Sequence, residues 1–145
     1  MSKENGTVLL AEDDDEDFHL VERAFKKLDL SKKIVRARDG QELIDYLHGH
    51  PHPELILLDL NMPIKGGREV LREIKADDRL RDIPVVVLTT SKLEGDVDRA
   101  YELGVNSFIR KPSGQEEFVE MVRIVCRYWF EIVELPRQGE TPRYD

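Results

Sequence analysis

LILLD, residues 55 to 59, decides the fold class, because it is a fully apolar strand that ends on an acid. PVVVLT, residues 84 to 89, has the same apolar character and is rich in β-branched residues. Strands without an alternating polar face are typical of parallel sheets that helices cover on both sides. The same stretch raises a chemical question, since a strand buried in this way has no packing need for the carboxylate of Asp59.

Helical patterns separate these strands from further ones. Three more strands are predicted: TVLLA (7–11), KIVRAR (33–38) and NSFIR (106–110). Three capping-box patterns predict helix starts: DGQE (39–42), SKLE (91–94) and SGQE (113–116). Gly104 predicts a helix C-cap, and the last helix is expected to continue to about Val133. The sequence therefore predicts an α/β fold, a single doubly wound domain of five βα units around a parallel sheet.

The size and charge of the chain narrow the class of protein. Its 145 residues suit one domain, expected over 1–135 and followed by a short polar tail, 136–145. A formal net charge of -8 argues against a nucleic-acid partner. No run of about 20 apolar residues is present, so no membrane span is expected. The single cysteine, Cys126, excludes an internal disulfide and suits a reducing, cytoplasmic location.

Charged and hydroxyl side chains follow four of the predicted strands. Glu12 and Asp13 follow the first strand, Asp59 and Thr89 end the third and fourth, and Lys111 follows the fifth. Ligands of open α/β sheets bind beyond the carboxyl ends of the strands, so these groups are expected to meet there. Carboxylates at neighbouring strand ends repel each other unless a cation intervenes, and hard oxygen ligands suit Mg²⁺. Such a site could receive a phosphoryl group on a carboxylate, with Thr89 as a hydroxyl donor.

Other acids after the first strand have a simpler interpretation. Asp14, Asp15 and Glu16 are predicted to form the first turn of a helix, where negative charge favours the helix dipole.

Four motifs in order resemble one family over about residues 6 to 133. They are EDD (12–14), LLDLNMP (57–63), LTTS (88–91) and FIRKP (108–112). The chain resembles the response regulator receiver domain of two-component signalling. This resemblance implies a flavodoxin-like fold with sheet order 2-1-3-4-5.

The resemblance also implies roles at the phosphoryl site. Asp59 would accept a phosphoryl group from the phosphohistidine of a sensor histidine kinase. Asp13 would bind Mg²⁺ directly, Glu12 mainly through a water, and Asn61 through its backbone carbonyl. Lys111 would pair with a phosphoryl oxygen.

Further implications concern the switch. Thr89 and Phe108 would form the switch pair, with Phe108 standing where many family members have tyrosine. The bond from Lys111 to Pro112 would be cis. EIVELP (131–136) makes the chain look like the small stand-alone regulators paired with bacterial phytochromes. A phytochrome kinase upstream, and an output through protein contact, are the expectations.

The last predicted helix carries two apolar stripes, whereas one stripe suffices to pack on a sheet. We expect a homodimer through this helix and the segment after it, with Tyr101 as a further contact; the alternative is an extension that folds back onto its own domain. The expected interface residues are Phe118, Val122, Cys126, Trp129, Phe130 and Val133.

Other functions fit the residues less well. An aspartyl-phosphate hydrolase usually has an Asp-x-Asp pair and a substrate cap, whereas Asn61 replaces the second acid here. A flavin mononucleotide carrier needs a phosphate loop after the first strand, where EDDDED (12–17) would repel a phosphate. A receiver-like binding module that is never phosphorylated is a third alternative. HGHPHP (48–53) reads as a loop, with transition-metal binding as its minor alternative.

Overall fold

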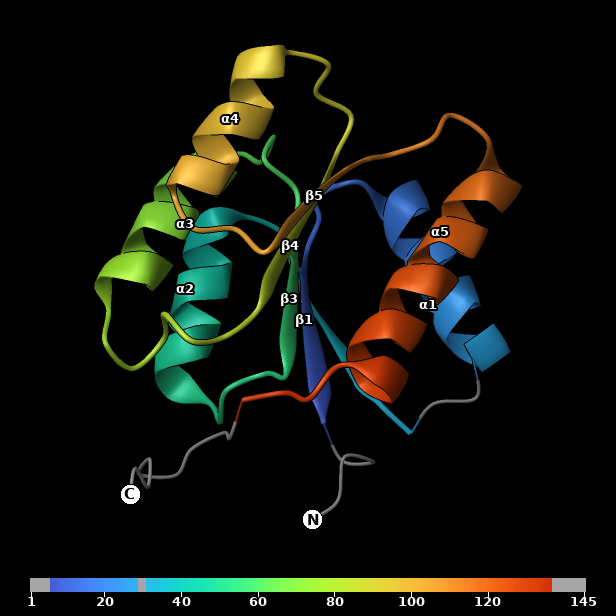
Figure 1. The fold of residues 1–145 in the computed structure, drawn as a ribbon, viewed down its shortest axis with the longest axis horizontal. Coiled ribbons are helices and arrows are strands. Elements are labelled where there is room, and N and C mark those ends of the chain that lie inside the picture. Colours follow the sequence, from blue (N-terminus) through green and yellow to red (C-terminus); the bar gives the residue numbers. More distant parts are fainter. Residues whose placement is uncertain (1–5, 29–30, 137–145) are drawn as a thin grey trace.

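Parallel strands and helices alternate along the chain in a computed structural model that describes residues 6–28 and 31–136 (Figure 1). The sheet order is β2-β1-β3-β4-β5, so the doubly wound α/β fold with order 2-1-3-4-5 is confirmed. The strands are β1 (Thr7–Ala11), β2 (Lys33–Ala37), β3 (Leu55–Leu58), β4 (Val85–Thr89) and β5 (Ser107–Arg110). The helices are α1 (Asp15–Leu28), α2 (Gly40–Gly49), α3 (Gly67–Ala76), α4 (Glu94–Glu102), α5 (Gln115–Arg127) and the π-helical turn η2 (Tyr128–Ile132).

Successive residues of the central strands face opposite sides of the sheet. In β3, Leu55 and Leu57 pack among α1 and α5, whereas Ile56 and Leu58 pack among α2 and α3. Figure 1 shows α2, α3 and α4 over one face of the sheet and α1 and α5 over the other. All four residues of β3 are fully buried, as the unbroken apolar run predicts.

Helices begin at all three predicted capping boxes, but the predicted side-chain cap forms at one of them. Asp39 is the N-cap of α2 and accepts a hydrogen bond from the Glu42 amide at 2.8 Å. Helices also begin at SKLE and SGQE, α4 at Glu94 and α5 at Gln115, but the predicted serine caps are wrong. Leu93 and Gly114 stand at the N-cap positions, and neither makes a side-chain cap. The Ser91 hydroxyl instead donates to Asp96 within α4, which leaves Ser91 in the preceding loop.

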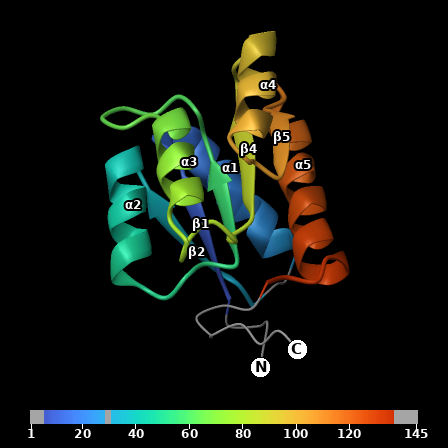
Figure 2. The ribbon, with the colours of Figure 1, turned by 60° about the vertical axis from the view of Figure 1, so that its left-hand side comes forward.

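The connection from α4 to β5 covers the sheet edge. Gly104, just after α4, has a φ of +100°, the left-handed conformation that favours glycine and that its predicted role as a C-cap requires. Among the described strands, β5 pairs only with β4, so it is an edge strand of this sheet, and Figure 2 shows it between α4 and α5. The Phe108 amide of β5 donates to the Tyr101 hydroxyl of α4 at 3.2 Å. Tyr101 thus occupies one of the free donors of the edge.

The residues expected at a dimer interface need correction. Phe118, Val122, Cys126, Trp129 and Phe130 are buried within their own chain, and Val133 packs partly against the same cluster. The physical reason is that α5 packs on the sheet and also against Val21 and Phe25 of α1, so each apolar stripe has a neighbour. Burial also raises the pKa of the Cys126 thiol to about 12, as suits a core residue. The exposed apolar side chains of this segment are Ile124, Tyr128 and Ile132.

Two other expectations concern the ends and the surroundings of the chain. The predicted tail, 136–145, lies outside the described residues except for Pro136. Within 6–28 and 31–136, no helix combines the length and the apolar character needed to cross a membrane.

Candidate functional site

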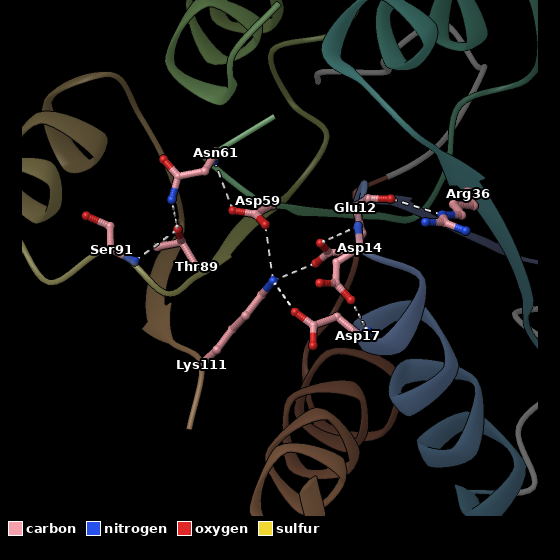
Figure 3. Close-up of polar contacts among 9 residues, drawn as sticks. All are labelled: Glu12, Asp14, Asp17, Arg36, Asp59, Asn61, Thr89, Ser91 and Lys111. Carbon is pink, nitrogen blue, oxygen red and sulfur yellow. Dashed lines mark hydrogen bonds and ion pairs between the residues drawn. The ribbon is translucent and has the colours of Figure 1, made fainter. Parts of the chain in front are cut away.

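The carboxylate of Asp59 lies just beyond the end of β3 and is almost fully buried (Figure 3). Its amide donates to the Ala11 carbonyl at the end of β1, which aligns the two strand ends. The Asn61 amide donates to Asp59 Oδ1 at 3.0 Å, and Lys111 Nζ donates to Oδ2 at 3.1 Å. Both oxygens are therefore oriented by groups from different elements, and the side chain is fixed.

The loop after Asp59 is strained and tightly packed. Ile64 has a φ of 67°, and the Lys65 amide donates to the Pro63 carbonyl at 2.7 Å, which closes a γ-turn. A β-branched residue in this conformation costs free energy that the surrounding structure must supply. Gly67 opens α3 so close to the loop that a Cβ there would lie 2.7 Å from the Asp59 carbonyl. No residue pattern indicated the strain at Ile64.

Lys111 contacts three carboxylates of the site. Its ammonium donates to Glu12 Oε1 at 2.6 Å, to Asp17 Oδ2 at 2.8 Å and to Asp59 Oδ2 at 3.1 Å, while only 4% of the side chain is exposed. Burial works to lower the pKa of Lys111, but the charges of Asp59 and Glu12 and these hydrogen bonds outweigh it and raise the pKa. The lysine is therefore a permanent cation. Sequence reasoning missed Asp17, which lies in the first turn of α1, four residues after Asp13 in the sequence.

Three acids gather where a divalent cation was expected. Carboxylate oxygens of Glu12, Asp13 and Asp59 lie within 4.8 Å of one another, and Asp13 is exposed whereas the other two are buried. Burial raises the pKa of Glu12 to about 7, the Asp59 charge adds to this, and Lys111 opposes it. Oxygen ligands with an open, exposed side fit a hard divalent cation that keeps several waters. The carbonyl of Asn61 as a further ligand stays a prediction.

Neighbouring residues hold the loop that carries Glu12 and Asp13. The Asp14 amide donates to Glu12 Oε2 at 3.2 Å. Arg36 Nε donates to the Glu12 carbonyl at 2.9 Å, and the Arg36 guanidinium lies 4.7 Å from the Phe18 ring centre. These contacts tie the end of β1 to β2 and α1 (Figure 3).

The remaining acids of this segment behave as a helix N-terminus, as predicted. Asp14 Oδ1 accepts from the Asp17 amide at 3.0 Å, which caps α1. Asp15 pairs with Arg36 at 2.8 Å, and hydrogen bonding to Arg36, with the charges of Arg36 and Arg38, lowers its pKa. Glu16 is exposed.

Thr89 joins the site from the end of β4, whereas Phe108 does not. The Thr89 hydroxyl is fully buried and accepts from Asn61 Nδ2 and from the Ser91 amide, both at 3.3 Å. Phe108 packs partly against the core on the α2–α4 face of the sheet. The structure brings Thr89 beside Asp59 through Asn61, and the predicted coupling of Thr89 to Phe108 stays a prediction.

A second polar network lies behind Thr89. Asp96, buried in the first turn of α4, accepts hydrogen bonds from the Ser91 hydroxyl and from the Arg68 guanidinium. These contacts lower the pKa of Asp96, with the Ser91 hydrogen bond as the largest cause and Arg68 next. Arg110 Nε donates to the Ser91 carbonyl at 3.0 Å. The loop that carries Ser91 is thus held from α3, α4 and β5, which no sequence motif indicated.

One expectation is not met by the geometry, and one minor alternative gains no support from it. The peptide bond between Lys111 and Pro112 is trans, as are the other bonds in the described residues, so the cis bond implied by the resemblance is wrong here. Trans is the lower-energy form of such bonds by about 0.5–1 kcal/mol. In the segment 48–53, His48 and Gly49 end α2 and residues 50–53 form a loop, in which His50 stacks on Tyr46 with ring centres 4.1 Å apart. The residue groups that could hold a metal, within 6–28 and 31–136, include no histidine.

Comparison with known proteins identifies the same pattern elsewhere. The chain matches the response regulator receiver domain over residues 8–123. Response regulator Rcp1 of Synechocystis sp. (strain ATCC 27184 / PCC 6803 / Kazusa) is 42% identical over 135 residues, which covers 89% of this chain and 92% of Rcp1. The probable methanogenesis regulatory protein FilR2 of Methanothrix harundinacea (strain 6Ac) is also 42% identical, over 84% of this chain and 82% of FilR2.

Solved structures agree with the fold. The Mn²⁺-bound form of Rcp1 superposes with a TM-score of 0.87 at 41% identity, over 91% of this chain and 99% of that one. The phosphorylated cyanobacterial phytochrome response regulator RcpA superposes with a TM-score of 0.88 at 38% identity, over 92% and 99% of the two chains. With the acids, the threonine and the lysine gathered at one edge of this sheet, the chain belongs to the response regulator receiver family.

Proposed function

We propose that Asp59 accepts a phosphoryl group from the phosphohistidine of a sensor histidine kinase, in a reaction that requires Mg²⁺. One observation carries the proposal. Asp59 is the carboxylate that both the Lys111 ammonium and the acid group of Glu12 and Asp13 face. A nucleophile for phosphoryl transfer needs cations on both sides of the developing charge, and this residue has them once a divalent ion is bound.

The protein's own groups supply orientation and charge. Bound at Glu12, Asp13 and Asp59, Mg²⁺ would neutralise the charge on the phosphoryl oxygens. An Asp59 oxygen attacks phosphorus, an O–P bond forms, the P–N bond of the donor breaks, and its electron pair returns to the imidazole. Lys111 donates to a phosphoryl oxygen, and the Thr89 hydroxyl, which now accepts from Asn61 and Ser91, turns to donate to another. The protein acts only on its own side chain, so we propose a switch and not an enzyme with a separate substrate.

The first experiment is intact mass after incubation with acetyl phosphate, with and without Mg²⁺. Wild type should gain one phosphoryl group only with the metal, and Asp59→Asn should gain none. Asp98→Asn, which changes an exposed acid of α4, is the matched control and should be labelled as wild type is. Labelling of Asp59→Asn would place the acceptor elsewhere, and labelling without a divalent ion would remove the metal from the reaction.

We propose a phytochrome as the kinase and a cytoplasmic location. The likeness to Rcp1 and RcpA supports the first proposal, although FilR2 is as similar in sequence as Rcp1. The free, buried Cys126 suits the reducing cytoplasm. Transfer from an autophosphorylated phytochrome kinase should be at least ten times faster than from an unrelated histidine kinase. Equal rates would contradict the assignment.

We also propose a homodimer, through a surface revised to the exposed side of α5 and η2. Ile124, Tyr128 and Ile132 recur every four residues and are 59%, 50% and 71% exposed, so they form an apolar stripe. Light scattering should report a dimer that Ile132→Lys weakens, while Leu93→Lys, at an equally exposed apolar residue away from the stripe, leaves it intact. A wild-type monomer at high concentration, phosphorylated or not, would refute the dimer.

A further inference from the structure

We propose that Asp17 is a positioning residue for Lys111. When Asp59 is phosphorylated, the Lys111 ammonium gives up its contact with the Asp59 carboxylate and binds a phosphoryl oxygen, and Asp17 holds the ammonium in place during this exchange. The inference rests on the proposed phosphorylation of Asp59 and assigns a role to a residue outside the acceptor and metal sets.

The hydrogen-bonding capacity of Lys111 is fully used. An ammonium has three N–H donors, and Lys111 Nζ meets three carboxylates, those of Glu12, Asp17 and Asp59, at 2.6, 2.8 and 3.1 Å. A phosphoryl oxygen can therefore become a partner only when one of these contacts is given up. The contact with Asp59 is the longest of the three.

The other two carboxylates, those of Glu12 and Asp17, have different roles. Phosphorylation uses one Asp59 oxygen for the bond to phosphorus, and that removes the charge of the carboxylate. Glu12 belongs to the acid group that fits the divalent ion, whereas Asp17 does not. Asp17 is thus the carboxylate that can stay fully charged and paired with Lys111 throughout the exchange.

The position of Asp17 is itself fixed. Asp17 is in the first turn of α1, and its amide donates to the capping Asp14 side chain at 3.0 Å. Helical side chains lean towards the N-terminus, which here is the end that faces the site. Figure 3 shows the Asp17 carboxylate pointing at Lys111 from the side opposite Asn61. An acid in the first turn of a helix usually points into solvent, but the Asp17 side chain is only 24% exposed. Its orientation towards the site therefore reflects the ion pair with Lys111.

The first test needs no phosphorylation. The ammonium groups of Lys111 and Lys32 are both buried in ion pairs, so their N–H protons should exchange slowly enough to be followed by ¹H–¹⁵N NMR, with assignments from Lys111→Met and Lys32→Met. Asp17→Ala should shift the Lys111 signal and speed its exchange about tenfold or more, with a smaller change in Asp17→Asn, which keeps an acceptor. The Lys32 signal, and both signals in Glu16→Ala, should not change. An unchanged Lys111 signal in Asp17→Ala would overturn the proposal.

The second test measures the rate of labelling by acetyl phosphate in a double-mutant cycle. Asp17→Ala should slow labelling about tenfold, the value of one charge-assisted hydrogen bond, and Glu16→Ala should not. In a Lys111→Met background, Asp17→Ala should change the rate less than about twofold, because its effect acts through the lysine. Faster labelling of Asp17→Ala would show that Asp17 competes with the phosphoryl group and would refute the positioning role. Absence of labelling in wild type would refute the proposed function, and the NMR result would still decide the role of Asp17.

Discussion

Lys32 and Glu54 form a buried ion pair at the amino-terminal ends of the strands, opposite the carboxyl ends where Asp59 lies, with 2.8 Å between Nζ and Oε1. Each residue lies just before a strand, Lys32 before β2 and Glu54 before β3, and the two side chains are only 3% and 11% exposed. Lys32 also lies 4.8 Å from the centre of the Phe130 ring in η2. The pair therefore joins the sheet to the end of the C-terminal helical segment.

Removal of one partner of this pair should be costly. Lys32→Met leaves the Glu54 charge buried and unpaired, so we expect a loss of about 3–5 kcal/mol in the free energy of unfolding, measured by urea titration. Lys32→Met combined with Glu54→Leu should recover most of that loss. The exposed pair of Arg23 and Glu116 is the control, and Arg23→Met should cost less than about 1 kcal/mol. Equal losses at the two pairs would contradict the proposed role of burial.

The contribution of Asp96 to stability should depend on pH. Its folded-state pKa is lowered by Ser91 and Arg68, so its stabilisation is fully present above the unfolded-state pKa of about 3.9 and is lost as pH falls through the lower folded value. Urea titrations should show wild type more stable than Asp96→Asn by a constant amount from neutral pH to about pH 5, and by a shrinking amount below about pH 4. Asp98→Asn, at an exposed acid of the same helix, controls for the loss of one negative charge from α4. A stability difference that grew in acid would refute the assignment.

The buried hydroxyl of Thr89 should contribute to stability before any phosphorylation. Thr89→Val keeps the shape but leaves the donors of Asn61 and Ser91 without their acceptor, at a cost of about 1–3 kcal/mol in the free energy of unfolding. Thr89→Ser keeps the hydroxyl and should cost less. Because Thr89 is not the acceptor, mass spectrometry should still detect phosphorylation of Thr89→Val. A variant as stable as wild type would mean that these two hydrogen bonds are not needed.

Asp13 should destabilise the metal-free protein and be required for the metal. Its charge lies close to those of Glu12 and Asp59, so Asp13→Asn should raise the melting temperature without metal. Mg²⁺ should raise the melting temperature of wild type by mass action, and this increase should be largely lost in Asp13→Asn. Glu16→Gln removes a nearby charge outside the acid group and should respond to Mg²⁺ as wild type does. The same Mg²⁺ response in Asp13→Asn would exclude Asp13 as a ligand.

Local patterns predicted the strands because each strand depends on residues close in sequence. The buried runs of β3 and β4 and the groups at their ends need only the rule that parallel strands finish at one edge. The capping boxes at 91–94 and 113–116 failed because a short pattern cannot tell whether a serine is used elsewhere, as Ser91 is by Asp96. The apolar stripes of α5 were misread because packing against α1, which comes about ninety residues earlier, supplies the second neighbour. Asp17 was missed because its partner, Lys111, is 94 residues away.

The hydroxyl of Tyr101 has a consequence for the behaviour of the protein in concentrated solution. An open strand edge with free amide groups can template pairing with another chain, which is a common route to aggregation. Tyr101 engages the Phe108 amide on that edge of β5. Tyr101→Phe keeps the ring and releases that donor, so the variant should aggregate faster than wild type at equal thermal stability, a difference that turbidity at a fixed temperature would detect. The Tyr101 hydroxyl is therefore expected to reduce aggregation of the protein.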